Sequence, residues 1–423
     1  MFALFRNADF VRLFFGRLIT NAGDSLYAVA AMWLVYELGG SAFYTGLAGF
    51  LTMAPNALQF LAGPLVDRWS LRNTLVVTQI FEFLLVLSIP VLFYLGWLNV
   101  TVVLVAMPII AAIEQFAFPA QTAALPRILG KDDLVKGNSA FSFAYQGVNL
   151  AFNGLAGILV ALIGAASLFL IDSVTFAAAT LLFLTLKLPK SSAKPVEKEG
   201  ESKTVRRAFT KYMTDLKEGF RFVMGSIVAK FFIGSVAANF AFGAAMAVMP
   251  AYADWRGGAE YYGFMMAALS AGFLIGALLS PYVERFPMGK MEVVAFTLST
   301  VLWVSSVLVP WNVVSIVLFG MATIPIGATE VLFSAVMQRI VPERLLARTF
   351  SVIVSISTSA MPLGSLVGGA LGTVFGSAVI FGVAASGILL VATVWLLVPD
   401  LRRMPKANDI DPQKYGLVEK ATG

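Results

Sequence analysis

The sequence predicts an all-α integral membrane protein with about twelve transmembrane helices in two pseudo-symmetric six-helix bundles, with both termini in the cytoplasm. Three observations predict this fold: apolar stretches of spanning length, Lys and Arg confined to alternate loops, and a motif that recurs in the second half. Composition agrees, since 59% of the 423 residues are hydrophobic and 13% are charged. With a mean hydropathy of +0.84, the chain has too little polar surface for a soluble fold.

The spans are stretches of roughly 20 apolar residues, because a helix of that length crosses a hydrocarbon core of about 30 Å. They are expected at 13–36, 43–66, 74–95, 100–124, 138–162, 167–187, 225–250, 262–283, 291–310, 313–336, 351–374 and 377–398. The first stretch has full spanning length and no small-residue cleavage site behind a short core. We therefore expect a transmembrane helix there and not a cleaved signal peptide.

Basic residues follow alternate loops once these spans are drawn. The N-terminus, the loops after the second, fourth, eighth and tenth spans, the central segment and the tail contain almost all of the 30 Lys and Arg. Of the intervening loops, one holds a basic residue, Arg256, and the others hold none. This positive-inside pattern predicts cytoplasmic termini. It also accounts for the pI of about 9.4, so we expect membrane lipids as partners and no nucleic acid.

One long polar segment divides the chain. We expect an N-terminal bundle over 1–187, a cytoplasmic linker over 188–224, a C-terminal bundle over 225–398 and a cytoplasmic tail over 399–423. In the second half of the linker, apolar residues at helical spacing alternate with charges, which predicts a helix lying on the cytoplasmic membrane surface. A plain solvated linker is the alternative.

The two halves carry traces of a duplication. The stretch 63–69, Gly-Pro-Leu-Val-Asp-Arg-Trp, resembles 280–286, Ser-Pro-Tyr-Val-Glu-Arg-Phe. The same separation carries Gln121 onto Gln338, near the ends of the fourth and tenth spans. A shared separation at equivalent helix ends favours two related bundles with a substrate cavity between them.

The chain contains no Cys and no His. Their absence excludes disulfides, zinc held by Cys or His, HExxH metalloprotease chemistry and a Ser-His dyad. We expect no catalytic residues, no metal and no cofactor, so an enzyme is the least favoured class. Any proton handling inside the membrane must use carboxylates, with help from Tyr or Lys.

Carboxylates inside the spans are the main functional candidates, because a charge at a helix centre costs about 2.5 to 3.5 kcal/mol even on the lenient insertion scale. Burial favours the protonated carboxyl, so such residues can exchange protons. Three lead the ranking as proton-coupling or substrate-binding residues: Asp24, Glu114 and Glu330. Their polar or aromatic neighbours Asn21, Gln115 and Phe118 join them. The alternative for each acid is a structural hydrogen bond to a neighbouring helix.

Further residues in the spans are expected mainly to hold helices together. The secondary site candidates are Asp172, Glu82, Gln146 and Asn149. Asp172 and Glu82 are interpreted as interhelical hydrogen-bonding groups, whereas Gln146 and Asn149 form a polar face that either lines the cavity or bonds a neighbour. Gly272 and Gly276 have the GxxxG spacing, which predicts close helix packing.

The loop after the second span resembles the signature motif of the major facilitator superfamily, G-x-L-x-D-R-x-G-R-K. Gly63, Asp67, Arg68 and Arg72 match it, whereas Ser70 and Leu71 depart from it. The resemblance implies a conformational latch at these four residues and not a substrate contact. Mutation of Asp67 is therefore expected to impair transport without redefining the substrate.

The chain from about residue 8 to 400 is similar to the branch of this superfamily that contains macrolide efflux proteins and the enterobactin exporter. The stretches that carry the similarity are 21–24, 40–42, 118–120, 346–351 and 360–364. The resemblance implies a secondary active transporter that is a monomer in a bacterial inner membrane.

That transporter would export amphipathic small molecules or drugs, macrolide-like or multidrug, in exchange for protons by alternating access. Two departures concern its coupling: Ile110 stands near the place of the arginine of many antiporters, and the span-five antiporter motif survives only as Asn153, Gly154 and Gly157. One alternative is a dedicated exporter or flippase of a single natural product, such as a siderophore or lipid. A second is a non-transporting membrane sensor.

Overall fold

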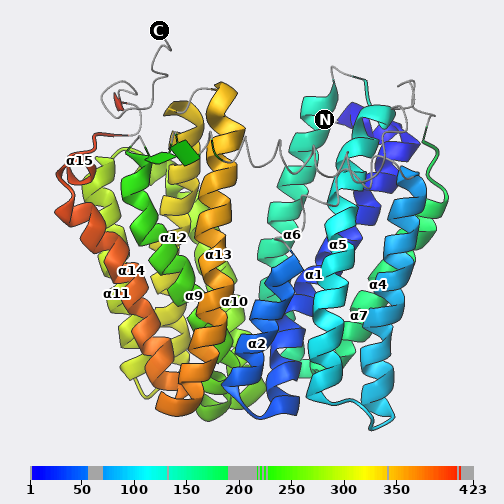
Figure 1. The fold of residues 1–423 in the computed structure, drawn as a ribbon, viewed down its shortest axis with the longest axis horizontal. Coiled ribbons are helices and arrows are strands. Elements are labelled where there is room, and N and C mark those ends of the chain that lie inside the picture. The colour runs from blue at the N-terminus through cyan, green and yellow to red at the C-terminus, as the bar shows by residue number, and fades with distance from the viewer. Residues whose placement is uncertain are drawn as a thin grey trace. The chain divides into compact units, whose positions relative to one another are not determined.

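The computed structural model describes residues 2–55, 70–130, 133–188, 227–340, 343–406 and 409–410, together with 217, 220, 221, 223 and 224. Within them, the regular secondary structure is helical (Figure 1). The chain forms two compact units. Unit 1 comprises Met1–Gly39 with Leu51–Tyr212, and unit 2 comprises Gly40–Phe50 with Met213–Gly423.

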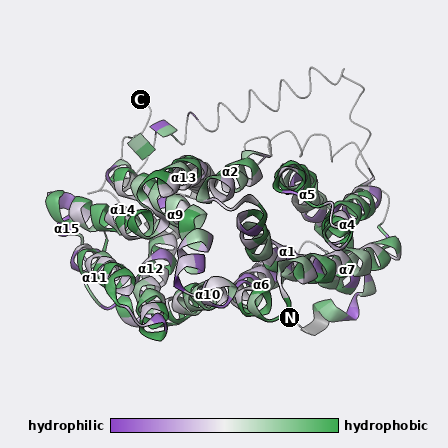
Figure 2. Ribbon diagram, turned by 90° about the horizontal axis from the view of Figure 1, so that it is seen from below, coloured by the Kyte–Doolittle hydropathy of each residue, from purple (hydrophilic) through white to green (hydrophobic). Residues whose placement is uncertain are grey.

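Ten helices of the described chain are long and apolar enough to cross a membrane. Two further apolar stretches of helix are shorter within the described residues: Ala42–Met53, and Ser359–Phe375 at the end of the helix Glu343–Phe375. The helices of both units are coloured mainly as hydrophobic in Figure 2, as expected where the surroundings are lipid and not water. The prediction of a polytopic helical membrane protein is confirmed, while the count of twelve spans and the side on which the termini lie stay predictions.

Unit 1 is built around a long first helix. Its elements are η1 Phe2–Arg6, α1 Ala8–Gly39, α4 Leu71–Tyr94, α5 Val100–Ile128, α6 Leu134–Ile163 and α7 Ala165–Leu184. Helix α1 packs against α5, α6 and α7, and α4 packs against α5 and α7. Asn99 caps α5 by accepting a hydrogen bond from the amide of Val102 at 3.1 Å. Gly164 joins α6 to α7 with φ of 79°, a conformation that favours glycine.

Unit 2 contains α9 Val228–Arg256, α10 Gly258–Val283, α11 Met288–Leu308, α12 Asn312–Ile340, α13 Glu343–Phe375, α14 Ser377–Leu397 and α15 Pro399–Arg402, with most of α2 Ala42–Met53. Helix α9 packs against α13 and α14, and α12 packs against α10 and α11. A buried aromatic group, Tyr252, Trp303, Phe319 and Phe381, joins α9, α11, α12 and α14. The indole of Trp303 donates to the carbonyl of Phe381 at 3.0 Å, which satisfies its one polar group.

The prediction of close packing at Gly272 and Gly276 is confirmed. A Cβ at Gly272 would overlap Thr323 and the carbonyl of Gly320, and one at Gly276 would overlap the carbonyl of Ile324. Both contacts lie on α12, so the glycines let the backbones of α10 and α12 approach each other.

The division between the units at 212 and 213 falls inside the predicted linker 188–224. Most of that linker, including the predicted surface helix, lies outside the described residues, as does the tail from 411. The domain bounds drawn from the sequence therefore stay predictions. Within unit 2, the hydroxyl of Ser365 donates to the carbonyl of Gly46 at 3.1 Å, which ties α2 to α13.

Candidate functional site

Helix α1 carries the polar centre of unit 1. Arg17 is buried, with 6% of its surface exposed, and its Nε donates to Gln121 Oε1 on α5 at 3.1 Å and to the Tyr145 hydroxyl on α6 at 3.4 Å. The Tyr145 hydroxyl donates to the same Gln121 oxygen. These contacts hold a positive charge inside a membrane-spanning bundle.

Four carboxyl groups from four helices surround this charge. Asp24 on α1, Glu82 on α4, Glu114 on α5 and Asp172 on α7 lie close enough to interact electrostatically, and Arg17 interacts with Asp24, Glu82 and Glu114. Glu82 and Asp172 are buried at 2% and 1% exposure, whereas Asp24 is half-buried and Glu114 is exposed. Glu82 and Asp172, which were predicted to be interhelical hydrogen-bonding groups, therefore belong to one cluster with Asp24 and Glu114.

Asp172 is incompletely hydrogen-bonded. Its Oδ1 accepts from the Thr175 hydroxyl at 3.0 Å, while its buried Oδ2 has no hydrogen-bond partner among the described residues. A Cβ at Gly23 would overlap both Asp172 Oδ1 and the Thr175 hydroxyl, so α7 brings this carboxyl directly against α1, next to Asp24. Such a free acceptor inside a bundle is a place where a proton can be held.

Glu82 and its neighbour show the same pattern. Glu82 Oε2 accepts from Gln79 Nε2 at 2.6 Å, and the fully buried Gln79 leaves its Oε1 without a partner among the described residues. On α1, the buried Oδ1 of Asn21 and the hydroxyl of Tyr27 also lack partners within the described chain. Unit 1 thus contains several buried polar atoms that lack a hydrogen-bond partner among the described residues.

The remaining sequence candidates of unit 1 are only partly described. Ser25 on α1 donates to Asn149 Oδ1 on α6 at 2.9 Å, which places the predicted polar face of α6 against α1. Gln115 donates to the carbonyl of Ala111 on its own helix at 3.1 Å. The backbones of Phe118 and Gln146 are helical, but their side chains lie outside the described set.

The latch motif is also mostly outside the described residues. This holds for Gly63, Asp67 and Arg68. Arg72, at the start of α4, donates to the carbonyl of Leu184 at the end of α7. The latch role of the motif stays a prediction.

Unit 2 contains a second acidic site, inside a cavity of about 380 Å³. Two glutamates line it: Glu330 on α12, which is exposed, and Glu292 on α11, which is 2% exposed. Sequence analysis missed Glu292, which is the second residue of the predicted span 291–310. Its helix in fact begins at Met288 and buries this carboxyl against α12 and α14.

The wall of this cavity is aromatic and uncharged apart from the two glutamates. It contains no Lys or Arg among the described residues. Its polar members are Ser235, Asn239, Thr329 and Ser357, and its aromatic members are Phe242, Phe273, Phe296, Phe333 and Trp395. Such a wall suits a ligand that is apolar with a positive charge.

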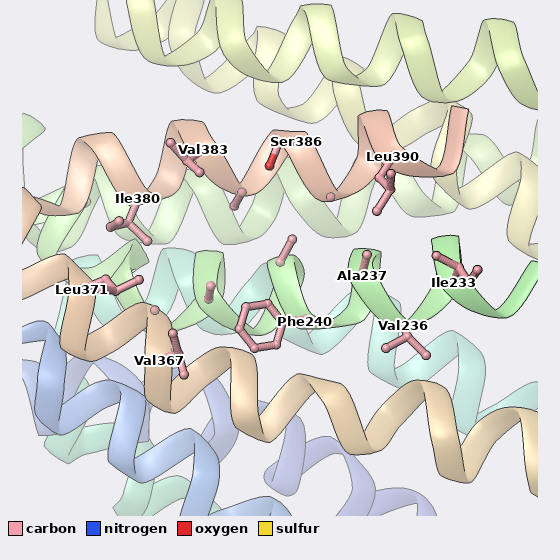
Figure 3. A pocket seen from close by; sticks show the side chains of 15 residues that line it. Ile233, Val236, Ala237, Phe240, Val367, Leu371, Ile380, Val383, Ser386 and Leu390 are labelled. Carbon is pink, nitrogen blue, oxygen red and sulfur yellow. The ribbon is translucent and has the colours of Figure 1, made fainter. Parts of the chain in front are cut away.

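A separate groove in unit 2 has a different character. It is about 700 Å³ in volume and lies between α9, α13 and α14 (Figure 3). Ser386 is the one hydroxyl-bearing side chain in its lining, and Ile233, Val383 and Phe240 project along its apolar walls. No charged residue lines it within the described chain, so it can hold hydrocarbon but cannot select a charge.

The chain is similar in sequence to known membrane transport proteins. A family model described as transmembrane secretion effector matches residues 1–419. The chain is 26% identical over 411 residues to the multidrug efflux pump Tap of Mycolicibacterium fortuitum, covering 94% of this chain and 97% of that protein. It is also 26% identical over 288 residues to the enterobactin exporter EntS of Escherichia coli O1:K1 / APEC, covering 66% of this chain and 65% of that protein.

Solved structures show the same fold at low identity. A bacterial homologue of the human lysosomal transporter Spinster, solved in an inward-facing and occupied conformation, matches with a TM-score of 0.67. The match covers 92% of this chain and 95% of that one at 14% identity. It supports the helical transporter fold and leaves the substrate open.

Proposed function

Since the chain belongs to the transmembrane secretion effector family of the major facilitator superfamily, we propose that it exports amphipathic small molecules in exchange for protons. Members and relatives of this family are transporters, so the protein is a multi-pass membrane transporter and not an enzyme. Export of drugs is supported by the relative that is a multidrug efflux pump.

The acid cluster of unit 1 is the observation that carries the proposal. Asp24, Glu82 and Glu114 interact with one cation of the described chain, Arg17, and Asp172 interacts with these acids but not with Arg17. If all four acids were ionised, three negative charges would remain uncompensated in a low-dielectric interior, at a cost of several kcal/mol each. The cluster therefore requires bound protons, which are the coupling ions of the proposed exchange.

Proton binding and substrate binding are coupled through the access state. A protonated cluster favours one conformation and a bound substrate favours the other, so each ligand displaces the equilibrium set by the other. Asp24 and Glu114 are the members with exposed surface, so they exchange protons with water, and the buried Glu82 and Asp172 share the charge.

The orientation follows from the loop charges. Cytoplasmic termini and a bacterial inner membrane agree with the alternate basic loops. With this orientation, protons move inward down their gradient and substrate moves outward, and one chain is sufficient for the cycle.

A dedicated exporter of one natural product is the second candidate function. The enterobactin exporter among the relatives favours it. A dedicated exporter would protect growing cells against few or none of a chemically varied drug panel, whereas a multidrug exporter would protect against several.

Proteoliposomes provide the direct test. Vesicles with an acidic lumen should accumulate the fluorescent cation ethidium, and a protonophore should abolish the accumulation. Asp24→Asn should remove the gradient-driven component, while Glu260→Gln, which alters an exposed carboxylate at the start of α10, should not. Ethidium accumulation that ignores the pH gradient in the wild type would refute proton exchange.

A further inference from the structure

A buried carboxyl without a counter-charge lies in the cavity of unit 2. Glu292 is 2% exposed, lines the cavity, and has no hydrogen bond or salt bridge to another described residue. An uncompensated carboxylate in such a place is costly, because burial removes its hydration and no charged or hydrogen-bonding group replaces it. A buried acceptor that faces an open cavity is therefore positioned for a ligand.

Both units carry a buried and an exposed glutamate on two consecutive helices, although Glu292 lies nearer the start of its helix than Glu82 does. In each unit, a buried glutamate precedes an exposed one on the next helix: Glu82 and Glu114 on α4 and α5, and Glu292 and Glu330 on α11 and α12. In unit 1 the buried member interacts with Arg17. In unit 2 the described cavity wall supplies no such cation.

We propose that the cavity of unit 2 binds the positively charged end of an amphipathic organic cation, with Glu292 as the buried counter-charge and Glu330 at the accessible side. This inference deepens the proposed export function and rests on it for the passage of the substrate. The cavity volume of about 380 Å³ lies at the lower end of the range of small-molecule sites. It accommodates a cationic head group with attached rings and not a macrolide as a whole.

The aromatic wall supports an organic cation over other ligands. Trp395 and four phenylalanines line the cavity, and aromatic rings attract a desolvated cation. An inorganic divalent ion prefers several oxygen ligands with fixed geometry. Within the described chain, no group of three or more Asp or Glu side chains is arranged so that it could hold a metal ion.

Equilibrium binding in detergent, without any pH gradient, tests the proposal. The probe is tetraphenylphosphonium, a monovalent amphipathic cation, titrated into the full-length protein by calorimetry. Glu292→Gln should weaken its affinity about tenfold or more, since the neutral amide keeps the shape and removes the charge. Glu292→Asp should stay within about threefold of the wild type, and Trp395→Leu should weaken binding about threefold to tenfold. Glu260→Gln is the matched control for loss of a carboxylate outside the cavity.

The charge-keeping variant guards against a folding artefact. A purely structural carboxyl at this position would tolerate isosteric Gln better than the shorter Asp, which is the reverse of the order expected for a counter-charge. Unchanged tetraphenylphosphonium affinity in Glu292→Gln would overturn the proposal, as would Glu292-dependent binding of Mn²⁺ in place of the organic cation.

This result is separable from that of the proposed function. Proton-driven accumulation in wild-type vesicles tests exchange, and the gradient-free titration tests the cation site. If the wild type shows proton-driven transport and Glu292→Gln binds tetraphenylphosphonium as tightly as the wild type does, the cation site alone is refuted. A wild type that binds the cation through Glu292 but ignores the pH gradient would refute proton exchange alone.

Discussion

The two units share a framework of helices but fill it differently. Both place a buried glutamate on one helix and an exposed glutamate on the next, Glu82 with Glu114 and Glu292 with Glu330. Around the first pair, unit 1 adds a buried Arg and two Asp. Hydrogen bonds from neighbouring side chains hold Arg17, Glu82 and Asp172 in place. Around the second pair, unit 2 leaves a cavity with an aromatic wall.

One residue pair illustrates this divergence. Asp172 lies on α7, the last long helix described in unit 1, and Ile388 lies on α14, the last long helix described in unit 2. Asp172 adds a carboxyl to the cluster of unit 1, whereas Ile388 adds an apolar face to the cavity of unit 2. Under the two proposals, corresponding helices of a duplicated fold serve protons in one half and an organic ligand in the other. Substitutions in either unit can test whether the two units differ in this way.

Removal of Arg17 should have the largest effect. Arg17→Met leaves the acids of unit 1 without their cation and should destabilise the protein by about 3 to 5 kcal/mol, with loss of transport. The control is Arg12→Met on the same helix, whose partly exposed ion pair with Asp9 at 2.8 Å should contribute at most about 1 kcal/mol. Thermal unfolding in detergent compares the two. Equal melting temperatures would contradict a structural charge centre at Arg17.

A side chain at Gly276 should disturb unit 2 selectively. Gly276→Val would force α10 away from the carbonyl of Ile324 and so displace the α12 wall of the cavity, at a cost of about 1 to 3 kcal/mol. Gly382→Ala is the control, because its nearest contact would be an ordinary 3.7 Å to Val307. Tetraphenylphosphonium affinity and thermal unfolding should both fall for Gly276→Val. An unaltered affinity would mean that the α10–α12 contact does not shape the site.

Filling the cavity of unit 2 should weaken cation binding there without removing the coupling to protons. Ile388→Phe adds volume to the wall and should lower tetraphenylphosphonium affinity about threefold to tenfold, while the ethidium uptake that remains should still depend on the pH gradient. Calorimetry and vesicle uptake measure the two properties. Loss of both together would contradict the separation of the sites.

The hydrogen bond at Asp172 should give the smallest effect. Thr175→Val removes the donor at 3.0 Å from Asp172 Oδ1 and should cost about 0.5 to 1.5 kcal/mol, whereas Thr175→Ser keeps the hydroxyl. Chemical or thermal unfolding resolves the difference. A Val variant as stable as the Ser variant would show that the bond contributes nothing to unit 1.

Hydropathy and loop charge were sufficient to predict the helical membrane fold, because each span must satisfy its backbone and its side chains locally in lipid. The number of spans stays open, since α2 and the apolar stretch Ser359–Phe375 of α13 are shorter than a full crossing within the described residues. The close contact of α10 with α12 was also predictable, because two glycines at helical spacing have few other uses.

The grouping of the site residues was harder to predict. Asp24, Glu114 and Glu330 follow from the rarity of acids in spans, but their partners depend on which helices meet. Glu82 and Asp172 read as isolated helix contacts until α4 and α7 bring them to α1 and α5. Arg17 lies within the predicted first span, and its burial depends on the packing of α5 and α6 against α1. Packing, and not the local sequence, decides these cases.

The most direct test of the division between the units is tetraphenylphosphonium affinity in Asp24→Asn and Glu292→Gln, measured side by side by calorimetry on the full-length protein. If unit 1 serves protons and unit 2 serves the cation, Asp24→Asn should bind within about threefold of the wild type, while Glu292→Gln should bind about tenfold or more weakly. Equal losses in both variants, or a loss confined to Asp24→Asn, would contradict the account.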